Sequence, residues 1–191
     1  MKIGILGGSF DPLHLGHIAL AETAKKALNL DKVLFLPSGN HPFKKNTTIL
    51  SAEKRYELVS KALKNYPGLE TSRLDMVEDK TSYTSDLVRS LQEIYSEDEL
   101  FMIAGDDIVA ELPNWYEWKW LLENIQFVIA QRPETDRDIW DDLDYLEYFT
   151  FIKMPQHDIS STEIRRRIKQ NKDISGLVPE SILSEIKKYY K

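Results

Sequence analysis

Short apolar runs that alternate with segments of helical periodicity constrain the fold of this chain more than any other feature. The runs lie at residues 2–6, 33–36, 100–104, 125–130 and 149–152, with a weaker one between 69 and 77. Helical patterns lie at about 16–29, from Ser51 to the Pro67-Gly68 pair, and around 85–95. Strands that alternate with helices of this length form βαβ units. We therefore expect an α/β fold with an open parallel sheet flanked by helices.

Composition narrows the classes of function. The 191 residues suit one domain over residues 1–191, and the net charge of −6 disfavours a nucleic acid polymer as partner. The chain has no cysteine, which excludes disulfides, thiol nucleophiles and thiolate metal sites. The first residues contain no secretory signal, and no apolar run approaches the roughly 18 residues of a membrane span. We expect a cytoplasmic protein without a membrane partner; the oligomeric state stays open, a homo-oligomer included.

One stretch, residues 134–147, is dense in aspartate and glutamate. Ile139, Leu143 and Leu146 give it an apolar stripe at i, i+4 and i+7, which predicts a surface helix with a solvated acidic face.

The loop after the first strand carries the first candidate site and reads GGSFDPLHLGH over residues 7–17. Ligands of open α/β sheets bind beyond the carboxyl ends of the strands. Glycines let a phosphate approach the backbone, and the amides of the following helix N-terminus favour an anion. The loop is neither a Walker loop nor a dinucleotide fingerprint, because it has no Gly-Lys and no G-x-G-x-x-G spacing.

His14 and His17 are three residues apart and can share one side of the helix entrance. Two imidazoles there could donate hydrogen bonds to phosphate oxygens, and either could carry a proton beside an anion. The alternative is a pair of structural histidines that cap the loop. Zinc is a third option, but it would need further ligands, and only His41 and His157 remain.

A second candidate anion site begins at Ser160, where Ser160 and Glu163 form a capping box that predicts a helix start. Ile164 and Ile168 should face the core, and a helix cannot turn all three arginines of residues 165–167 to one ligand. We expect Arg165 to point inward, with Ser161 on its face and the Thr162 hydroxyl nearby, and Thr162 and Arg166 to share another face. Taken alone, the segment would better suit a capped surface helix with solvated arginines.

These two segments together resemble the nucleotidyltransferase superfamily. Its marks are an H-x-G-H motif after a G-G-x-F-x-P loop, here at residues 7–17, and an I-S-S-T-x-I-R signature, here at residues 159–165. The resemblance implies a Rossmann-like nucleotidyltransferase fold with a C-terminal helical segment. It also implies that the second motif binds the phosphates of ATP opposite the first.

Further segments resemble one branch, the bacterial nicotinate-mononucleotide adenylyltransferases. Residues 36–44 are similar to its L-P-x-x-x-P-P-H-K segment, and 82–86 match its S-Y-T-x-D. Residues 105–107 and 112–116 are similar to its G-A-D and L-x-x-W-Y, 131–133 to x-R-P, and 177–179 to L-V-P. Two places depart from the pattern: HPFK replaces P-P-H-K at residues 41–44, and Asp106 replaces a small residue.

The branch implies adenylyl transfer from ATP to nicotinate mononucleotide, with Mg²⁺ accompanying ATP and no protein metal ligands. Its motifs imply catalytic roles for His14, His17 and Arg165. They imply ATP contacts from Gly7, Gly8, Ser9, Phe10, Gly105, Asp107, Ser161 and Thr162. They imply nicotinate-mononucleotide contacts from Lys44, Tyr83, Thr84, Trp115, Tyr116 and Arg132. The alternatives are a related enzyme whose acceptor is nicotinamide mononucleotide or phosphopantetheine, a non-catalytic nucleotide sensor, and a zinc hydrolase.

Overall fold

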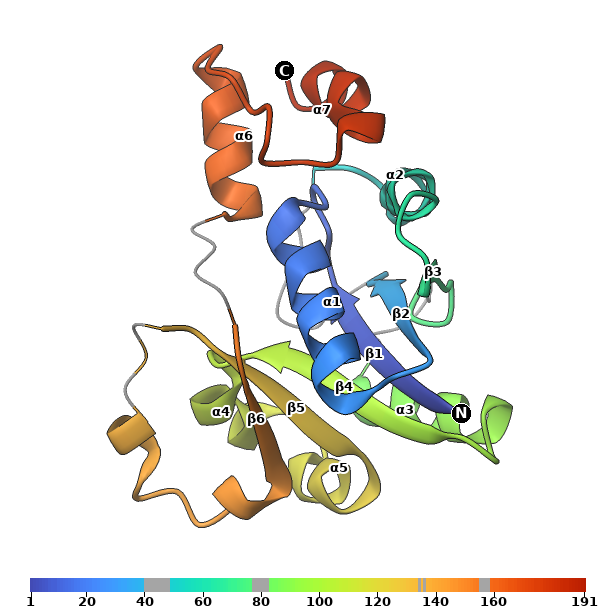
Figure 1. Ribbon diagram of the computed structural model, residues 1–191, viewed down its shortest axis with the longest axis vertical. Coiled ribbons are helices and arrows are strands. Elements are labelled where there is room, and N and C mark those ends of the chain that lie inside the picture. Colours follow the sequence, from blue (N-terminus) through green and yellow to red (C-terminus); the bar gives the residue numbers. More distant parts are fainter. Residues whose placement is uncertain (40–48, 77–82, 134, 136, 155–158) are drawn as a thin grey trace.

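A computed structural model describes residues 1–39, 49–76, 83–133, 135, 137–154 and 159–191 (Figure 1). Its strands are β1 (Lys2–Gly8), β2 (Lys32–Pro37), β3 (Leu69–Thr71), β4 (Glu99–Gly105), β5 (Gln126–Gln131) and β6 (Phe149–Lys153). Its α-helices are α1 (Leu15–Leu28), α2 (Ala52–Leu63), α3 (Thr84–Ile94), α4 (Ile108–Glu111), α5 (Trp118–Asn124), α6 (Ser161–Lys169) and α7 (Leu183–Tyr189). Short 3₁₀ turns are η1 (Leu112–Asn114), η2 (Arg137–Trp140), η3 (Leu146–Tyr148) and η4 (Glu180–Ile182).

The strands form one six-stranded sheet in the order β3-β2-β1-β4-β5-β6. All neighbouring strands are parallel, with Gly4 of β1 opposite Val33 of β2 and Phe101 of β4. This is the order of a doubly wound Rossmann sheet, in which the chain changes direction between β1 and β4. A ligand crevice is expected outside the carboxyl ends of these two central strands.

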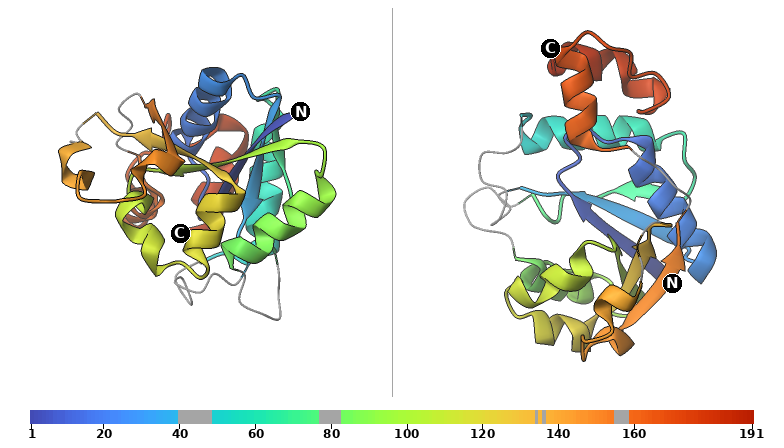
Figure 2. Two further views of the ribbon diagram at one scale, coloured as in Figure 1. Left: turned by 90° about the horizontal axis from the view of Figure 1, so that it is seen from below. Right: turned by 90° about the vertical axis from the view of Figure 1, so that its left-hand side faces the viewer.

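Each face of the sheet carries its own apolar core. In β2, Val33 and Phe35 belong to one cluster of buried side chains, and Leu34 and Leu36 belong to the other. Successive side chains of a strand point to opposite faces, which explains this division. The first cluster includes side chains of α1, α2, α6 and α7, and the second includes those of α3, α4 and α5. Figure 2 (left) shows α1 on one side of the strands and α3 and α5 on the other.

The alternation of apolar runs and helical patterns predicted these elements correctly. Every run is a strand, and the ends of the strands at 2–6, 33–36, 100–104, 125–130 and 149–152 differ by at most two residues from those expected. Ser51 is the N-cap of α2, where its hydroxyl accepts a hydrogen bond from the Lys54 amide at 3.3 Å. Ser160 likewise caps α6, accepting from the Glu163 amide at 3.1 Å.

The predicted acidic surface helix at 134–147 is wrong. The described part of this stretch forms only the turn η2 and the start of η3, and Ile139 is 68% exposed. Trp140 and Tyr145 are the buried residues instead. The Trp140 ring stacks on Phe151 at 5.6 Å, and the Tyr145 hydroxyl donates to the Val109 carbonyl at 2.9 Å. Trp140 and Tyr145 are not at helical spacing, and their contacts take the place of the expected apolar helix face.

The C-terminal helices α6 and α7 lie together at one end of the molecule, beyond α1 and α2 (Figure 1). Ile164 and Ile168 of α6 and Ile186 of α7 are buried in the cluster shared with α1 and α2. In the part of the chain that the structure describes, no helix has both the length and the apolar character needed to cross a membrane.

Candidate active site at the carboxyl edge of the sheet

The loop between β1 and α1 follows the central strand, as the sequence predicts. A side chain at Gly7 would meet nothing within 4 Å, so this exposed backbone is open to a ligand. A Cβ at Gly8 would lie 3.1 Å from the Phe10 ring, and Phe10 itself has a left-handed φ of 45°. The loop is therefore held in a tight conformation that a bulky residue adopts only under constraint from its surroundings.

The two histidines of the loop lie against each other. Their rings stack with centroids 3.6 Å apart, and the His14 amide donates to Nδ1 of His17 at 3.2 Å. Because Nδ1 of His17 accepts this hydrogen bond, the neutral imidazole of His17 carries its proton on Nε2. A Cβ at Gly16 would lie 3.0 Å from Nδ1 of His14, so glycine between the histidines leaves room for this stack.

His14 is only 7% exposed, and burial lowers its pKa to about 4 from the usual 6.5. The ring is thus neutral at pH 7. Its Nδ1 is buried and has no hydrogen-bond partner among the described residues. A buried polar atom without a partner is unusual, and a bound ligand is one way to satisfy it.

The N-terminus of α6 packs against this loop. Arg165 donates from Nη1 to the Asp11 carbonyl at 2.6 Å and from Nη2 to the Thr162 hydroxyl at 3.2 Å. The Ser161 hydroxyl donates to the Pro12 carbonyl at 2.9 Å. The structure therefore confirms that Arg165 points inward and brings it to the histidine loop.

The other two arginines of α6 lie elsewhere. Arg166 and Arg167 both pair with Glu163, whose pKa falls to about 2 because of these hydrogen bonds. The hydrogen bond between Thr162 and Arg165 confirms that this hydroxyl lies beside the inward arginine. The side chain of a threonine in the first turn reaches a residue three positions later on the same helix.

The ends of β4 and β5 form a second group of candidate residues. A Cβ at Gly105 would lie 2.8 Å from Oδ1 of Asp107 and 3.8 Å from Nη2 of Arg132. Asp106 is 4% exposed, and one of its oxygens accepts from the Arg132 amide at 2.9 Å and from the Thr135 hydroxyl at 2.6 Å. Its other oxygen lies 3.5 Å from Nε of Arg132. The sequence analysis noted Asp106 only because it replaces a small residue of the family pattern. In the structure it anchors Arg132.

Aromatic residues form a third group at the start of α3 and after η1. The rings of Tyr83 and Tyr116 lie 4.7 Å apart, and Tyr116 is 55% exposed. Thr84 is the first residue of α3, and Trp115 packs partly buried against the apolar cluster of that face. This ring pair, which is exposed at Tyr116, can offer a flat apolar surface to a heterocycle. Lys44, also expected here, lies outside the described residues.

The sequence analysis missed two buried residues, one in the histidine loop and one on α2. Asp11 and Arg55 are each 1% exposed and contact the loop and the neighbouring strand end, as described below. Arg55 occupies a position on α2 that the pattern assigns to the core, because Leu58, Val59 and Ala62 follow at i+3, i+4 and i+7. A charged residue on such a stripe is a signal that sequence reasoning could have used.

Comparison with known proteins assigns the family. A family model described as cytidylyltransferase-like matches residues 5–167. A probable nicotinate-nucleotide adenylyltransferase of Desulfitobacterium hafniense (strain Y51) is 39% identical over 98% of this chain and 93% of its own length. The chain belongs to the nicotinate-nucleotide adenylyltransferase family. Another such relative, from Carboxydothermus hydrogenoformans, is 36% identical over 97% of this chain and 94% of its own length.

Solved structures of this family share the fold. A Plasmodium falciparum nicotinic acid mononucleotide adenylyltransferase complexed with NaAD superimposes with a TM-score of 0.81 at 19% identity, covering 98% of this chain and 95% of that one. A putative nicotinate-nucleotide adenylyltransferase of Vibrio parahaemolyticus gives 0.70 at 23% identity, covering 97% and 99%. The expected Rossmann-like nucleotidyltransferase fold is confirmed.

Proposed function

We propose that this chain transfers the adenylyl group of ATP to nicotinate mononucleotide, giving deamido-NAD and pyrophosphate. Membership of the nicotinate-nucleotide adenylyltransferase family supports the substrates and the place of the reaction in NAD biosynthesis. The single structural observation that carries the proposal is the contact between the two elements for which anion binding is predicted. The His14–His17 loop after β1 and the Arg165 face of α6 meet through the Asp11 carbonyl, 2.6 Å from the guanidinium.

The reaction needs positioning more than it needs a protein nucleophile. The phosphate of nicotinate mononucleotide is an anion at neutral pH, so its oxygen attacks the α-phosphorus of ATP directly. A bond forms between that oxygen and phosphorus, the bond to the β-phosphate oxygen breaks, and pyrophosphate leaves with the electron pair. Such a displacement is accelerated by in-line alignment and by neutralisation of charge on the phosphoryl oxygens.

The described residues supply donors for that purpose. His17 offers Nε2–H, and Arg165 offers a permanent positive charge that suits phosphate oxygens. The buried Nδ1 of His14, which has no partner in the described part of the chain, is a further candidate contact. The open backbone at Gly7 and the amides of Gly8, Ser9 and Phe10, with Ser161 and Thr162 at α6, complete the proposed ATP contacts.

The acceptor would bind toward β4, β5 and α3. Arg132 uses Nε and its amide on Asp106, which orients the remaining guanidinium nitrogens for a phosphate. Asp107 follows Gly105 at a strand end, where a carboxylate suits a ribose hydroxyl. The Tyr83–Tyr116 pair suits the pyridine ring, with Thr84, Trp115 and Lys44 as the other proposed contacts.

We also propose that Mg²⁺ enters with ATP. Among the described residues, no three histidine, aspartate or glutamate side chains gather in a way that could hold a metal. Mg²⁺ commonly keeps several waters and binds substrate phosphates, and it would neutralise charge on them here. Asp107, exposed after the end of β4, is a carboxylate that could meet its water shell.

Parallel assays of pyrophosphate release test the function. The purified chain receives Mg²⁺-ATP with nicotinate mononucleotide, nicotinamide mononucleotide or phosphopantetheine as acceptor. We expect the highest kcat/KM with nicotinate mononucleotide. A clear preference for another acceptor would assign the related enzyme instead, and ATP binding without pyrophosphate release would identify a non-catalytic nucleotide sensor. Metal analysis of the active protein tests the zinc alternative.

A further inference from the structure

We infer that Tyr190, Asp11 and Arg55 form a buried positioning group that holds the histidine loop in its strained conformation and so couples α7 to adenylyl transfer. The inference rests on the proposed function, since it concerns the same site. Asp11 stands at a variable position of the G-G-x-F-x-P loop, and Arg55 and Tyr190 lie outside the sequence motifs of that site. Asp11 comes from the loop after β1, Arg55 from α2, and Tyr190 is the C-cap residue that follows α7.

The Asp11 carboxylate gathers donors from distant parts of the chain. It accepts from the Ile49 amide at 2.7 Å, from the Leu50 amide at 3.3 Å and from the Tyr190 hydroxyl. Asp11 is 1% exposed and Tyr190 is 2% exposed, so the bond between their side chains is shielded from water. Burial and the neighbouring carboxylate raise the pKa of Tyr190, which keeps its hydroxyl protonated as a donor.

Arg55 holds the backbone on the other side of the loop. It donates from Nη1 to the Ser9 carbonyl and from Nη2 to the Ser38 carbonyl, each at 2.6 Å, and from Nε to the Leu50 carbonyl at 3.2 Å. Ser38 follows β2, whereas Ser9 follows β1. One guanidinium thus ties the ends of two neighbouring strands and the start of α2 to one another.

Phe10 lies between these two anchored residues and carries the strain. Its φ of 45° is in the left-handed region, where a bulky side chain is unfavourable and persists only when its surroundings fix it. Arg55 fixes the carbonyl of Ser9 before it, and the Tyr190 hydroxyl and two amides fix the carboxylate of Asp11 after it. The group therefore opposes relaxation of this residue.

Phe10 and the residue after it contact side chains of the proposed active site directly. The Phe10 ring meets the His17 ring edge to face, with centroids 5.0 Å apart. The carbonyl of Asp11 accepts the Arg165 bond described above. A shift of residues 10 and 11 would therefore displace both a proposed catalytic histidine and a proposed phosphate-binding arginine. Displacements of about 1 Å are enough to reduce rates strongly.

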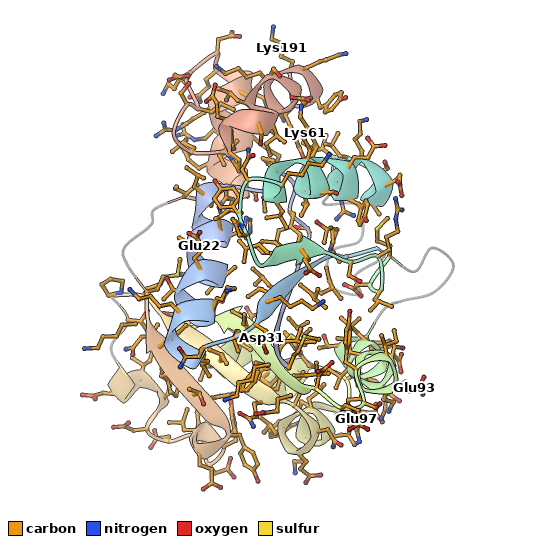
Figure 3. The ribbon with its side chains drawn as sticks, turned by 45° about the vertical axis from the view of Figure 1, so that its right-hand side comes forward. Glu22, Asp31, Lys61, Glu93, Glu97 and Lys191 are labelled. Carbon is orange, nitrogen blue, oxygen red and sulfur yellow. The ribbon has the colours of Figure 1, made fainter. Side chains whose placement is uncertain are left out.

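The helix α7 is held in place by contacts other than Tyr190. Its Glu185 pairs with Lys61 of α2, and Figure 3 shows the labelled Lys61 where α2 faces the C-terminal helices. Ile186 is fully buried in the cluster shared with α1 and α2. Removing one hydroxyl from Tyr190 should therefore leave α7 docked and affect mainly the carboxylate that it contacts.

The test compares Tyr190→Phe with Tyr189→Phe in the full chain. Tyr189 is the adjacent residue, and its ring lies over Lys54 at 5.1 Å rather than in the buried group, which makes it a matched control. Both are assayed with ATP and nicotinate mononucleotide well below their melting temperatures, alongside the ATP Kd. We expect Tyr190→Phe to raise the ATP KM and lower kcat/KM by about tenfold, and Tyr189→Phe to stay within about twofold.

A role in stability alone would lower the melting temperature of Tyr190→Phe and leave the kinetics of the folded protein unchanged, which would overturn the inference. Arg55→Lys provides a second variant, because lysine keeps the charge but cannot reach three carbonyls at once; we expect the same rise in ATP KM. If Tyr190→Phe does not fold, Arg55→Lys decides. If the parent chain shows no turnover, the proposed function fails, and the ATP Kd of the variants decides the inference separately.

Discussion

His14 should make the folded chain lose stability as the pH falls from 7 to 5. Burial lowers its pKa to about 4 in the folded state, whereas the unfolded chain has the ordinary value of 6.5. Between these two values the unfolded chain takes up a proton that the folded chain does not. The free energy of unfolding therefore decreases as the pH falls through this window, and it changes no further below about 4.

The magnitude follows from the two pKa values. The whole window from 6.5 to about 4 corresponds to ~3 kcal/mol, since each unit is worth about 1.4 kcal/mol. Between pH 7 and pH 5 the linkage relation gives ~2 kcal/mol from this residue alone. That is a large part of the 5–15 kcal/mol by which domains are typically stable.

Urea unfolding of the parent chain and of His14→Gln at both pH values measures this contribution. Glutamine does not titrate, so the variant should lose ~2 kcal/mol less stability than the parent chain between pH 7 and pH 5. Titration of the imidazole signals by NMR gives the pKa directly. Equal losses in the two proteins, or a measured His14 pKa above 6, would refute the assignment of a buried neutral ring.

Three substitutions test the proposed site by steady-state kinetics. His17→Ala should lower kcat at least tenfold, or about 1.4 kcal/mol of transition-state stabilisation, and an unchanged kcat in the folded variant would contradict its role. Arg165→Ala should raise the ATP KM about tenfold, while Arg166→Ala, on the outer face of the same helix, should stay within about twofold; equal effects would argue against an inward guanidinium. Asp106→Ala should raise the nicotinate-mononucleotide KM about fivefold and leave the ATP KM unchanged, because it removes the side chain that anchors Arg132. Fivefold is the equivalent of ~1 kcal/mol, and a selective rise in the ATP KM would contradict this role of Asp106.

Local patterns predicted the sheet because both of its faces are buried. The apolar runs of β1, β2, β4 and β5 are nearly continuous, as expected for strands covered by helices on both sides. The helix caps at Ser51 and Ser160 depend on residues three positions apart, so they too are readable from sequence. The single domain over residues 1–191 stays a prediction.

The failed helix at 134–147 shows where local periodicity is insufficient. Its stripe of Ile139, Leu143 and Leu146 has the right spacing, but the rings of Trp140 and Tyr145 find partners on other elements. Burial of large aromatic side chains outweighs a weak helical preference in a segment with many aspartates. Such partners cannot be deduced from a local window.

In the candidate site, too, some residues were predictable from local patterns and others were not. The histidine loop and Arg165 were predictable because each lies in one short motif whose geometry a helix N-terminus dictates. Asp11 and Tyr190 are 179 positions apart, and no periodicity relates them. The effect of Asp106 was missed for a different reason: its partners follow the neighbouring strand, so its role depends on the pairing of β4 with β5.

The central position of β1 has a consequence for how the chain folds during synthesis. Its Gly4 pairs on one side with Val33, which is made soon afterwards, and on the other side with Phe101. At about 5–20 residues per second, the second edge of β1 waits roughly 5 to 20 s for its partner. An apolar strand with an unpaired edge is prone to aggregation during such a delay. The nascent chain is therefore expected to need protection, by a chaperone or by the ribosome itself, until β4 emerges.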